Sequence, residues 1–131
     1  MKISGFSDHS SQQPCRLERL RRKADFDKVY AKGRRVPGRF FVGYFLFYQS
    51  GPLRLGVVAS RRVGGATRRN RAKRRLREVF RRNRPRQAVA ADVVLIARTA
   101  IIEASFGEID QAYVRGVGRA LEEGGRHPED V

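Results

Sequence analysis

The residues with the clearest chemistry lie between positions 61 and 86, where 13 Lys or Arg accompany one acid, Glu78. This segment carries a net charge of +12, out of +16 for the 131-residue chain. Arg outnumbers Lys by 24 to 5 in the whole sequence, and guanidinium groups bind phosphate bidentately and stack on bases. Charge concentrated on one segment favours a docking surface for a polyanion, and the arginine bias favours nucleic acid.

A basic helix over residues 67–82 would present this charge. A charged run is often only a solvated helix face, but such faces mix acids and bases, which pair four residues apart. Here like charges repel one another along the helix, so an anionic partner is favoured; the residues are Arg68, Arg69, Arg71, Lys73, Arg74, Arg75 and Arg77. Asn70, between two arginines, could read a base or a 2′-hydroxyl, or be a spacer on an exposed face.

The loop ahead of this helix contains Gly64 and Gly65. Backbone N–H groups at the helix N-terminus, with Arg61 and Arg62 beside them, could hold a phosphate. A plain connection before a helix is the alternative reading of the same residues.

Three aromatic residues form a second candidate site. Phe26 and Tyr30 lie one turn apart on a predicted helix, and Tyr44 lies on a predicted strand. Aromatic faces beside basic groups make stacking platforms for unpaired nucleotides. In a small domain most aromatic residues belong to the core, which is the alternative for these three.

Few residues suit metal or acid–base catalysis. His9 and His127 lie in polar ends of the chain and lack metal-ligand spacing with other ligands. A protein-only nuclease would need clustered carboxylates for Mg²⁺, and Glu103, Glu108 and Asp110 are the nearest candidates. Glu108 is better explained as a helix-capping residue. We therefore expect no catalytic residues and no metal site on this chain.

Composition narrows the class of protein further. No apolar run approaches the roughly 20 residues that span a bilayer, and residues 1–14 lack the apolar region of a signal peptide. One cysteine, Cys15, cannot form an internal disulfide. These features predict a cytoplasmic protein without a membrane partner.

The pattern predicts one domain over residues 16–123, with loose ends at residues 1–15 and 124–131. The expected elements are a helix over residues 24–32, strands over 39–48 and 54–60, a helix over 67–82 and a strand over 92–98. A last helix begins at a capping box formed by Ser105 and Glu108 and ends at Gly124. Residues 34–38 read as a turn, and a further short strand is possible at 59–63. The basic helix joins two strands and could be a crossover, right-handed by the usual rule.

The residues then match a known family. Residues 69–77 have the form R-N-R-x-K-R-x-x-R, which resembles the signature of the bacterial ribonuclease P protein subunit. The preceding Ser60-Arg61-Arg62-Val63-Gly64, the upstream Asp25-Phe26 and Val29-Tyr30, and the downstream Ile96-Ala97-Arg98 agree with it. The resemblance covers residues 16–121.

The resemblance implies a fold and an activity. The fold is an α/β (α+β) two-layer sandwich, with a mixed sheet of about four strands, three helices and a left-handed βαβ crossover, similar to a ribosomal-protein domain. The family's catalytic RNA removes the 5′ leader of precursor tRNA by Mg²⁺-dependent hydrolysis, with Mg²⁺ in the RNA active site and the protein as cofactor. The expected partners are that RNA and precursor tRNA, without an obligate protein partner.

The resemblance also implies two sets of site residues. The set that faces the catalytic RNA is Arg69, Asn70, Arg71, Lys73, Arg74 and Arg77. The set that holds the single-stranded leader is Phe26, Tyr30 and Tyr44, with Ser60, Arg61 and Arg62 at the edge of the cleft.

This sequence departs from the family pattern at several positions. Gly65 stands where many members carry Asn, and Tyr30 often corresponds to Phe. Arg68 and Arg75 stand where apolar residues are common, and the first helix lacks a good capping residue near Lys23. The alternative function is a structural RNA-binding protein of the ribosome, or of another ribonucleoprotein, without a catalytic role.

Overall fold

The computed structural model describes residues 17–124. The predicted N-terminal end, both histidines and Cys15 lie outside the described residues. Of the predicted C-terminal end, only Gly124 is described, and it closes the last helix. None of the helices within residues 17–124 is long and apolar enough to cross a membrane.

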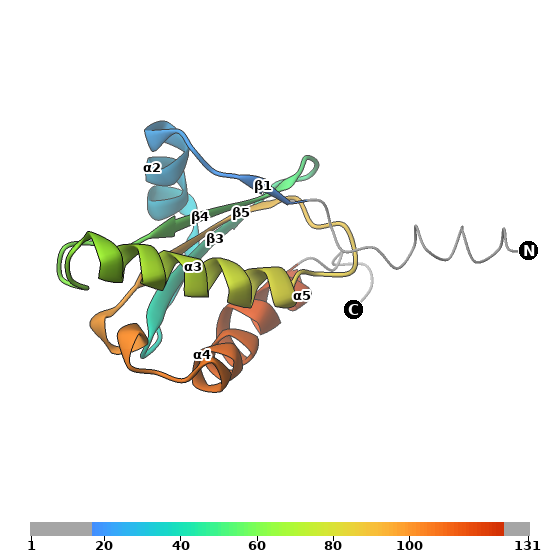
Figure 1. Cartoon of the computed structure of the whole chain (residues 1–131). Helices are drawn as coiled ribbons and strands as arrows, with labels where there is room; N and C mark the ends of the chain where they lie inside the picture. Colours follow the sequence, from blue (N-terminus) through green and yellow to red (C-terminus); the bar gives the residue numbers. More distant parts are fainter. Residues whose placement is uncertain (1–16, 125–131) are drawn as a thin grey trace, which may run out of the picture.

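The centre of the fold is a five-stranded mixed sheet with the order β1-β4-β5-β3-β2 (Figure 1). Its strands are β1 (Leu17–Arg19), β2 (Arg34–Val36), β3 (Phe41–Phe47), β4 (Leu53–Val58) and β5 (Ala91–Ala97). Strand β5 pairs in parallel with β4 and antiparallel with β3. The basic helix connects β4 to β5, so the predicted crossover is confirmed.

Four helical segments surround the sheet. They are α2 (Lys23–Lys32), α3 (Ala66–Arg82), the short η1 (Thr99–Ile102), and a last helix in which a π-helical turn, η2 (Val114–Gly118), joins α4 (Phe106–Tyr113) to α5 (Arg119–Gly124). The capping box predicted for the last helix is present: the Glu108 N–H donates to Ser105 Oγ at 3.1 Å, and the Ser105 N–H donates to Glu108 Oε1 at 2.9 Å.

The sheet differs from the strand prediction in three places. The sheet has five strands rather than about four, because β1 and β2 were missed. Residues Arg34–Val36, expected in a turn, pair with β3, whereas residues 59–63, a possible strand, leave the sheet and turn. Strands of three residues are too short for an alternating pattern, and only the backbone of a longer neighbour stabilises them.

Strand β3 is covered on both faces. Phe41, Phe45 and Phe47 belong to the main core, which α3 and the last helix share. Tyr44 and Leu46 pack on the other face, in a smaller cluster under α2. Figure 1 shows α3 lying across the sheet beside α4 and α5, with α2 standing apart from them. The two helices with candidate RNA-binding residues therefore lie on opposite faces of one sheet.

Candidate nucleic-acid interface

The apolar stripe of α3 orients its charged residues. Ala72, Leu76, Val79 and Phe80 are fully buried against the sheet and the last helix, as their helical spacing predicted. The opposite side of the helix therefore faces outward. Of the predicted RNA-facing residues, four are exposed and two, Arg69 and Lys73, are half-buried; the exposed ones are Asn70, Arg71, Arg74 and Arg77.

The charges of α3 are compensated only near its C-terminal end. Glu78 accepts hydrogen bonds from Arg81 at 2.7 and 3.0 Å and from Arg82 at 3.2 Å, and the bonds from Arg81 are the main cause that lowers the pKa of Glu78. Within residues 17–124, no salt bridge joins an acid to the cations before Glu78 on this helix. These cations are Arg68, Arg69, Arg71, Lys73, Arg74, Arg75 and Arg77. The positive potential of these cations can therefore attract an external anion.

Two of these arginines also support the fold. Arg75 Nη1 donates to the backbone carbonyl of Ile101 at 2.7 Å and ties α3 to η1. Arg69 Nη1 donates to the carbonyl of Gly64 at 3.1 Å and braces the loop before the helix. Arg75, one of the departures from the family pattern, therefore has a structural contact that an apolar side chain could not make.

The glycine loop before α3 contains one residue that requires glycine. Gly64 has φ +140°, a conformation that side chains rarely adopt, and the stem of Arg68 lies against it. Gly65 is the N-cap of α3, with φ −71° and without a side-chain cap, so the helix N-terminus keeps its backbone donors available. Ser60 Oγ accepts from the Arg62 N–H at 3.3 Å at the start of this turn.

The three predicted aromatic residues form one cluster. The Phe26 and Tyr30 rings have centroids 6.5 Å apart, and Tyr30 meets Tyr44 edge-on at 5.1 Å. Tyr30 is 38% exposed, unlike most large apolar side chains of the fold. Burial is the main cause that raises the pKa of the Tyr30 phenol, followed by Tyr44 and Asp27, so its hydroxyl stays a neutral donor at physiological pH. We call these three residues the aromatic cluster.

A glycine in β4 makes room for the aromatic cluster. A Cβ at Gly56 would lie 2.5 Å from the Cε1 and Cζ atoms of Phe26, closer than packing allows. Phe26 therefore lies directly on the β4 backbone. This contact was not expected from the sequence, because it depends on a long-range packing of α2 on the sheet.

A groove at the edge of the sheet is lined by one residue from each predicted set. Strand β1 pairs with β4 as far as Leu55, and residues of both strands line a cavity of about 360 Å³. Its lining includes Phe26, Arg77 of the signature, and two residues that the sequence analysis missed, Arg19 and Arg81. Burial and then the charge of Arg19 lower the pKa of Arg77, which indicates that these two guanidinium groups lie near each other. The spacing of Arg77 and Arg81, one turn apart, was the signal available in the sequence.

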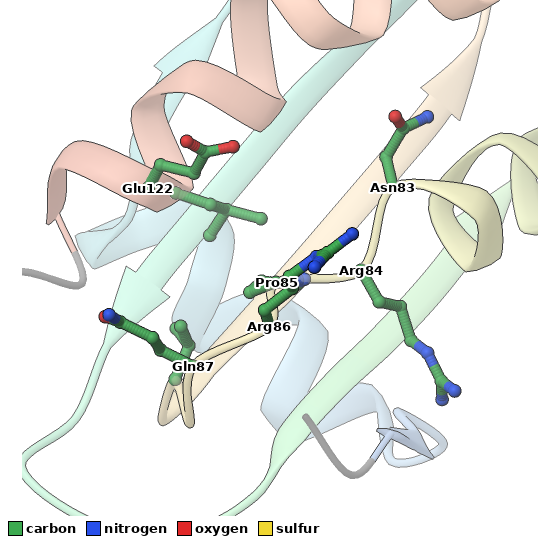
Figure 2. A pocket seen from close by; sticks show the side chains of 8 residues that line it. Asn83, Arg84, Pro85, Arg86, Gln87 and Glu122 are labelled. Atoms are coloured by element: carbon green, nitrogen blue, oxygen red, sulfur yellow. The ribbon is translucent and has the colours of Figure 1, made fainter. Parts of the chain in front are cut away.

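A second pocket lies just beyond the C-terminal end of α3. Figure 2 shows it between the loop after α3 and Glu122 of α5; its lining includes Arg84, Arg86 and Gln87. It has about 390 Å³, but none of the predicted site residues lines it. Asn83 at its rim already donates to Val79 O and to Asp110 Oδ1, both at 2.8 Å.

The carboxylates considered for a protein-only nuclease do not form a site. Glu108 caps a helix, and Asp110 accepts from Asn83. Within residues 17–124, no three His, Cys, Asp or Glu side chains are grouped so that they could hold a metal ion.

Comparison with known proteins decides the family. A family model described as ribonuclease P matches residues 15–121. The chain belongs to the ribonuclease P protein family. The resemblance inferred from residues 16–121 is thereby confirmed.

Individual members of the ribonuclease P family agree with this result. The ribonuclease P protein component of Symbiobacterium thermophilum is 45% identical over 94 residues, which cover 71% of this chain and 82% of that protein. The component of Thermotoga maritima is 39% identical over 100 residues, which cover 76% and 85%. Among solved structures, the RNase P protein of Staphylococcus aureus matches with a TM-score of 0.69 and 30% identity, over 80% of this chain and 96% of that one. The T. maritima protein matches with a TM-score of 0.67 and 32% identity, over 81% and 96%.

Membership in the ribonuclease P family assigns the chain to tRNA processing, as a protein component of ribonuclease P. It implies an RNA partner, and it confirms the predicted α+β fold with a mixed sheet and three main helices. The roles of individual residues stay predictions.

Proposed function

We propose that this chain binds the catalytic RNA of ribonuclease P through α3 and the 5′ leader of precursor tRNA through the aromatic cluster and the adjoining groove. The RNA carries out the hydrolysis that removes the leader. The observation that supports this division is the groove that both Arg77 of the signature and Phe26 of the aromatic cluster line. Two RNA segments could thus be held side by side.

The outward side of α3 suits a folded RNA backbone. Its cations before Glu78 have no acidic partner among the described residues, so phosphates would replace the repulsion between them with attraction. Arg71 and Arg74 are exposed and can make bidentate contacts. Such contacts position RNA without selecting its sequence.

The aromatic cluster suits an unpaired strand. Stacking of a base on an aromatic ring contributes about 1–3 kcal/mol and tolerates any base. Arg19 and Arg77, which also line the groove, would contact the phosphates of that strand, and the neutral Tyr30 hydroxyl would donate to it. A double-stranded RNA offers no free base faces to such a cluster.

We assign Mg²⁺ to the catalytic RNA. The most buried carboxylate of the described residues, Asp92, is 1% exposed, and Arg54 occupies both of its oxygens. The described residues therefore do not fit a dedicated Mg²⁺ site, and no step of the hydrolysis is assigned to them.

A structural RNA-binding role in the ribosome is the competing function. It would need the same charge on α3 but no groove for an unpaired strand. The half-exposed Tyr30 beside a cationic groove favours the leader-binding role.

Cleavage of a leader-bearing precursor tRNA at low Mg²⁺ tests the proposal. The protein alone, a bacterial ribonuclease P RNA alone, and the two together are compared. We expect the protein to enhance cleavage only in the presence of the RNA. Cleavage by the protein alone would overturn the assignment of hydrolysis to the RNA, and a lack of enhancement would favour the structural role.

A further inference from the structure

The strongest unassigned feature is a charged network that joins α2 to the sheet. Arg54 of β4 and Asp92 of β5 lie opposite each other in the parallel register. Arg54 Nε donates to Asp92 Oδ1 and Arg54 Nη2 to Asp92 Oδ2, both at 2.7 Å, and the Tyr48 hydroxyl donates to Oδ2 at 2.8 Å. A carboxylate that is 1% exposed requires such partners. These bonds fix the Arg54 guanidinium on the sheet.

The third arm of this guanidinium reaches α2. Arg54 Nη1 donates to Asp25 Oδ2 at 3.3 Å. Asp25 lies in the first turn of α2 and directly precedes Phe26. A planar guanidinium can serve both carboxylates at once, whereas a lysine ammonium on a flexible stem is a point charge.

Helix α2 rests on the smaller cluster mainly through Val29 and Phe26. It has ten residues, of which only Val29 is fully buried, and its N-cap Arg22 makes no side-chain cap. A helix of this length is marginal without tertiary contacts. The Arg54–Asp25 pair therefore adds a polar tertiary contact at the first turn of α2, where no side chain caps the helix.

Strand β4, which contains Arg54, also contacts Phe26. Gly56 is two residues after Arg54, on the same face of β4, and Phe26 lies on it. The ion pair and the ring contact thus set the same turn of α2 against neighbouring positions of β4. Any shift of this turn moves Phe26 relative to Tyr44.

We propose that Arg54 and Asp25 are positioning residues for leader binding: they set the first turn of α2 so that the aromatic cluster meets the unpaired strand. The inference rests on the proposed function. It assigns the pair no contact with RNA.

Asp25→Asn tests the inference, because it removes the pair and leaves Arg54 bound to Asp92. Asp27→Asn is the matched control: it makes the same charge change two residues along α2, where the carboxylate pairs with exposed Lys23 rather than with the sheet. In the reconstituted holoenzyme, we expect Asp25→Asn to weaken binding of leader-bearing precursor tRNA about fivefold. Binding of mature tRNA and of the catalytic RNA stays unchanged, as does every affinity in Asp27→Asn.

A double-mutant cycle with Phe26→Ala separates positioning from general destabilisation. If Asp25 acts through Phe26, the double variant binds the leader-bearing precursor no more weakly than Phe26→Ala alone. Additive losses, or equal losses for mature tRNA, would overturn the inference. Arg54→Lys keeps a charge beside Asp92 and should reproduce the Asp25→Asn result.

Phe26→Ala also distinguishes a failure of the proposed leader site from a failure of the positioning role of Arg54 and Asp25. If Phe26→Ala does not weaken leader binding, the proposed leader site itself is wrong. If it does and Asp25→Asn behaves as the original protein, only the positioning role is wrong.

Discussion

Helices α3 and α2 present their candidate RNA-binding residues in opposite ways. Helix α3 has 17 residues, buries a continuous apolar stripe, and leaves a field of cations without acidic partners among the described residues. Helix α2 has ten residues, buries one side chain fully, and is held by the smaller cluster, an ion pair and a glycine contact. The comparison teaches that a charged surface needs little positioning, because electrostatic attraction acts over distance, whereas stacking needs rings in place.

The largest effect is expected from the charges of α3. The double variant Arg71→Ala/Arg74→Ala should weaken binding of the catalytic RNA by about 3 kcal/mol, roughly a hundredfold, since each charge-assisted bond contributes about 1.5 kcal/mol. The slope of the binding constant against salt concentration should fall by about one unit for each phosphate that the variant no longer binds. Binding titrations at several salt concentrations measure both the affinity and the slope.

Arg115→Ala/Arg119→Ala is the control for that experiment. It removes the same charge from exposed positions of the last helix. An equal loss of affinity in both double variants would show that net charge, rather than the surface of α3, decides binding.

A smaller effect is expected when α2 is displaced. Gly56→Ala places a Cβ 2.5 Å from the Phe26 ring, so the ring must move. We expect binding of leader-bearing precursor tRNA to weaken about tenfold, which is within the range of one base-stacking interaction, with catalytic RNA binding unchanged. Gly65→Ala is the control, because a Cβ there meets nothing within 4 Å. Unchanged leader binding in Gly56→Ala would argue that the position of Phe26 is unimportant.

A substitution in the core beneath α3 should change the stability of the protein without changing its RNA-binding surface. The Tyr113 hydroxyl is buried without a hydrogen-bond partner among the described residues, and its ring packs on Phe80 of α3. Tyr113→Phe should raise the free energy of unfolding by about 1 kcal/mol, because an unsatisfied buried hydroxyl is costly. Urea denaturation measures this, and both RNA affinities should stay unchanged.

Tyr48→Phe provides the opposite case. Its hydroxyl donates to buried Asp92, so its loss should lower the free energy of unfolding by about 1 kcal/mol. Stabilisation of this variant would show that the hydroxyl bond contributes nothing to the Asp92 network.

The smallest effect is expected at the N-terminus of α3. Gly65 caps the helix without a side chain, and Asn there should add a few tenths of a kcal/mol of stability. Thermal unfolding measures this. A loss of catalytic RNA binding in Gly65→Asn, despite the added stability, would indicate that the free backbone donors of this loop contact phosphate.

The sequence by itself determined the features that local pattern controls. The spacing of Ala72, Leu76, Val79 and Phe80 predicted which side of α3 is buried. Ser105 and Glu108 predicted a capping box that is present, and the signature over residues 69–77 predicted the family. Each of these depends on residues within a few turns of one another, so no knowledge of the tertiary structure was needed.

Only the tertiary structure decided how distant residues meet. Strands β1 and β2 form because longer neighbours offer free backbone groups, and their three residues carry no periodic signal. The Arg54–Asp92–Asp25 network joins three separate elements. Arg77 of α3 and Phe26 of α2, which are distant in the chain, line one groove. Such contacts depend on the register of strands and on the packing of helices across a sheet. Residue types and their spacing along the chain do not specify these long-range arrangements.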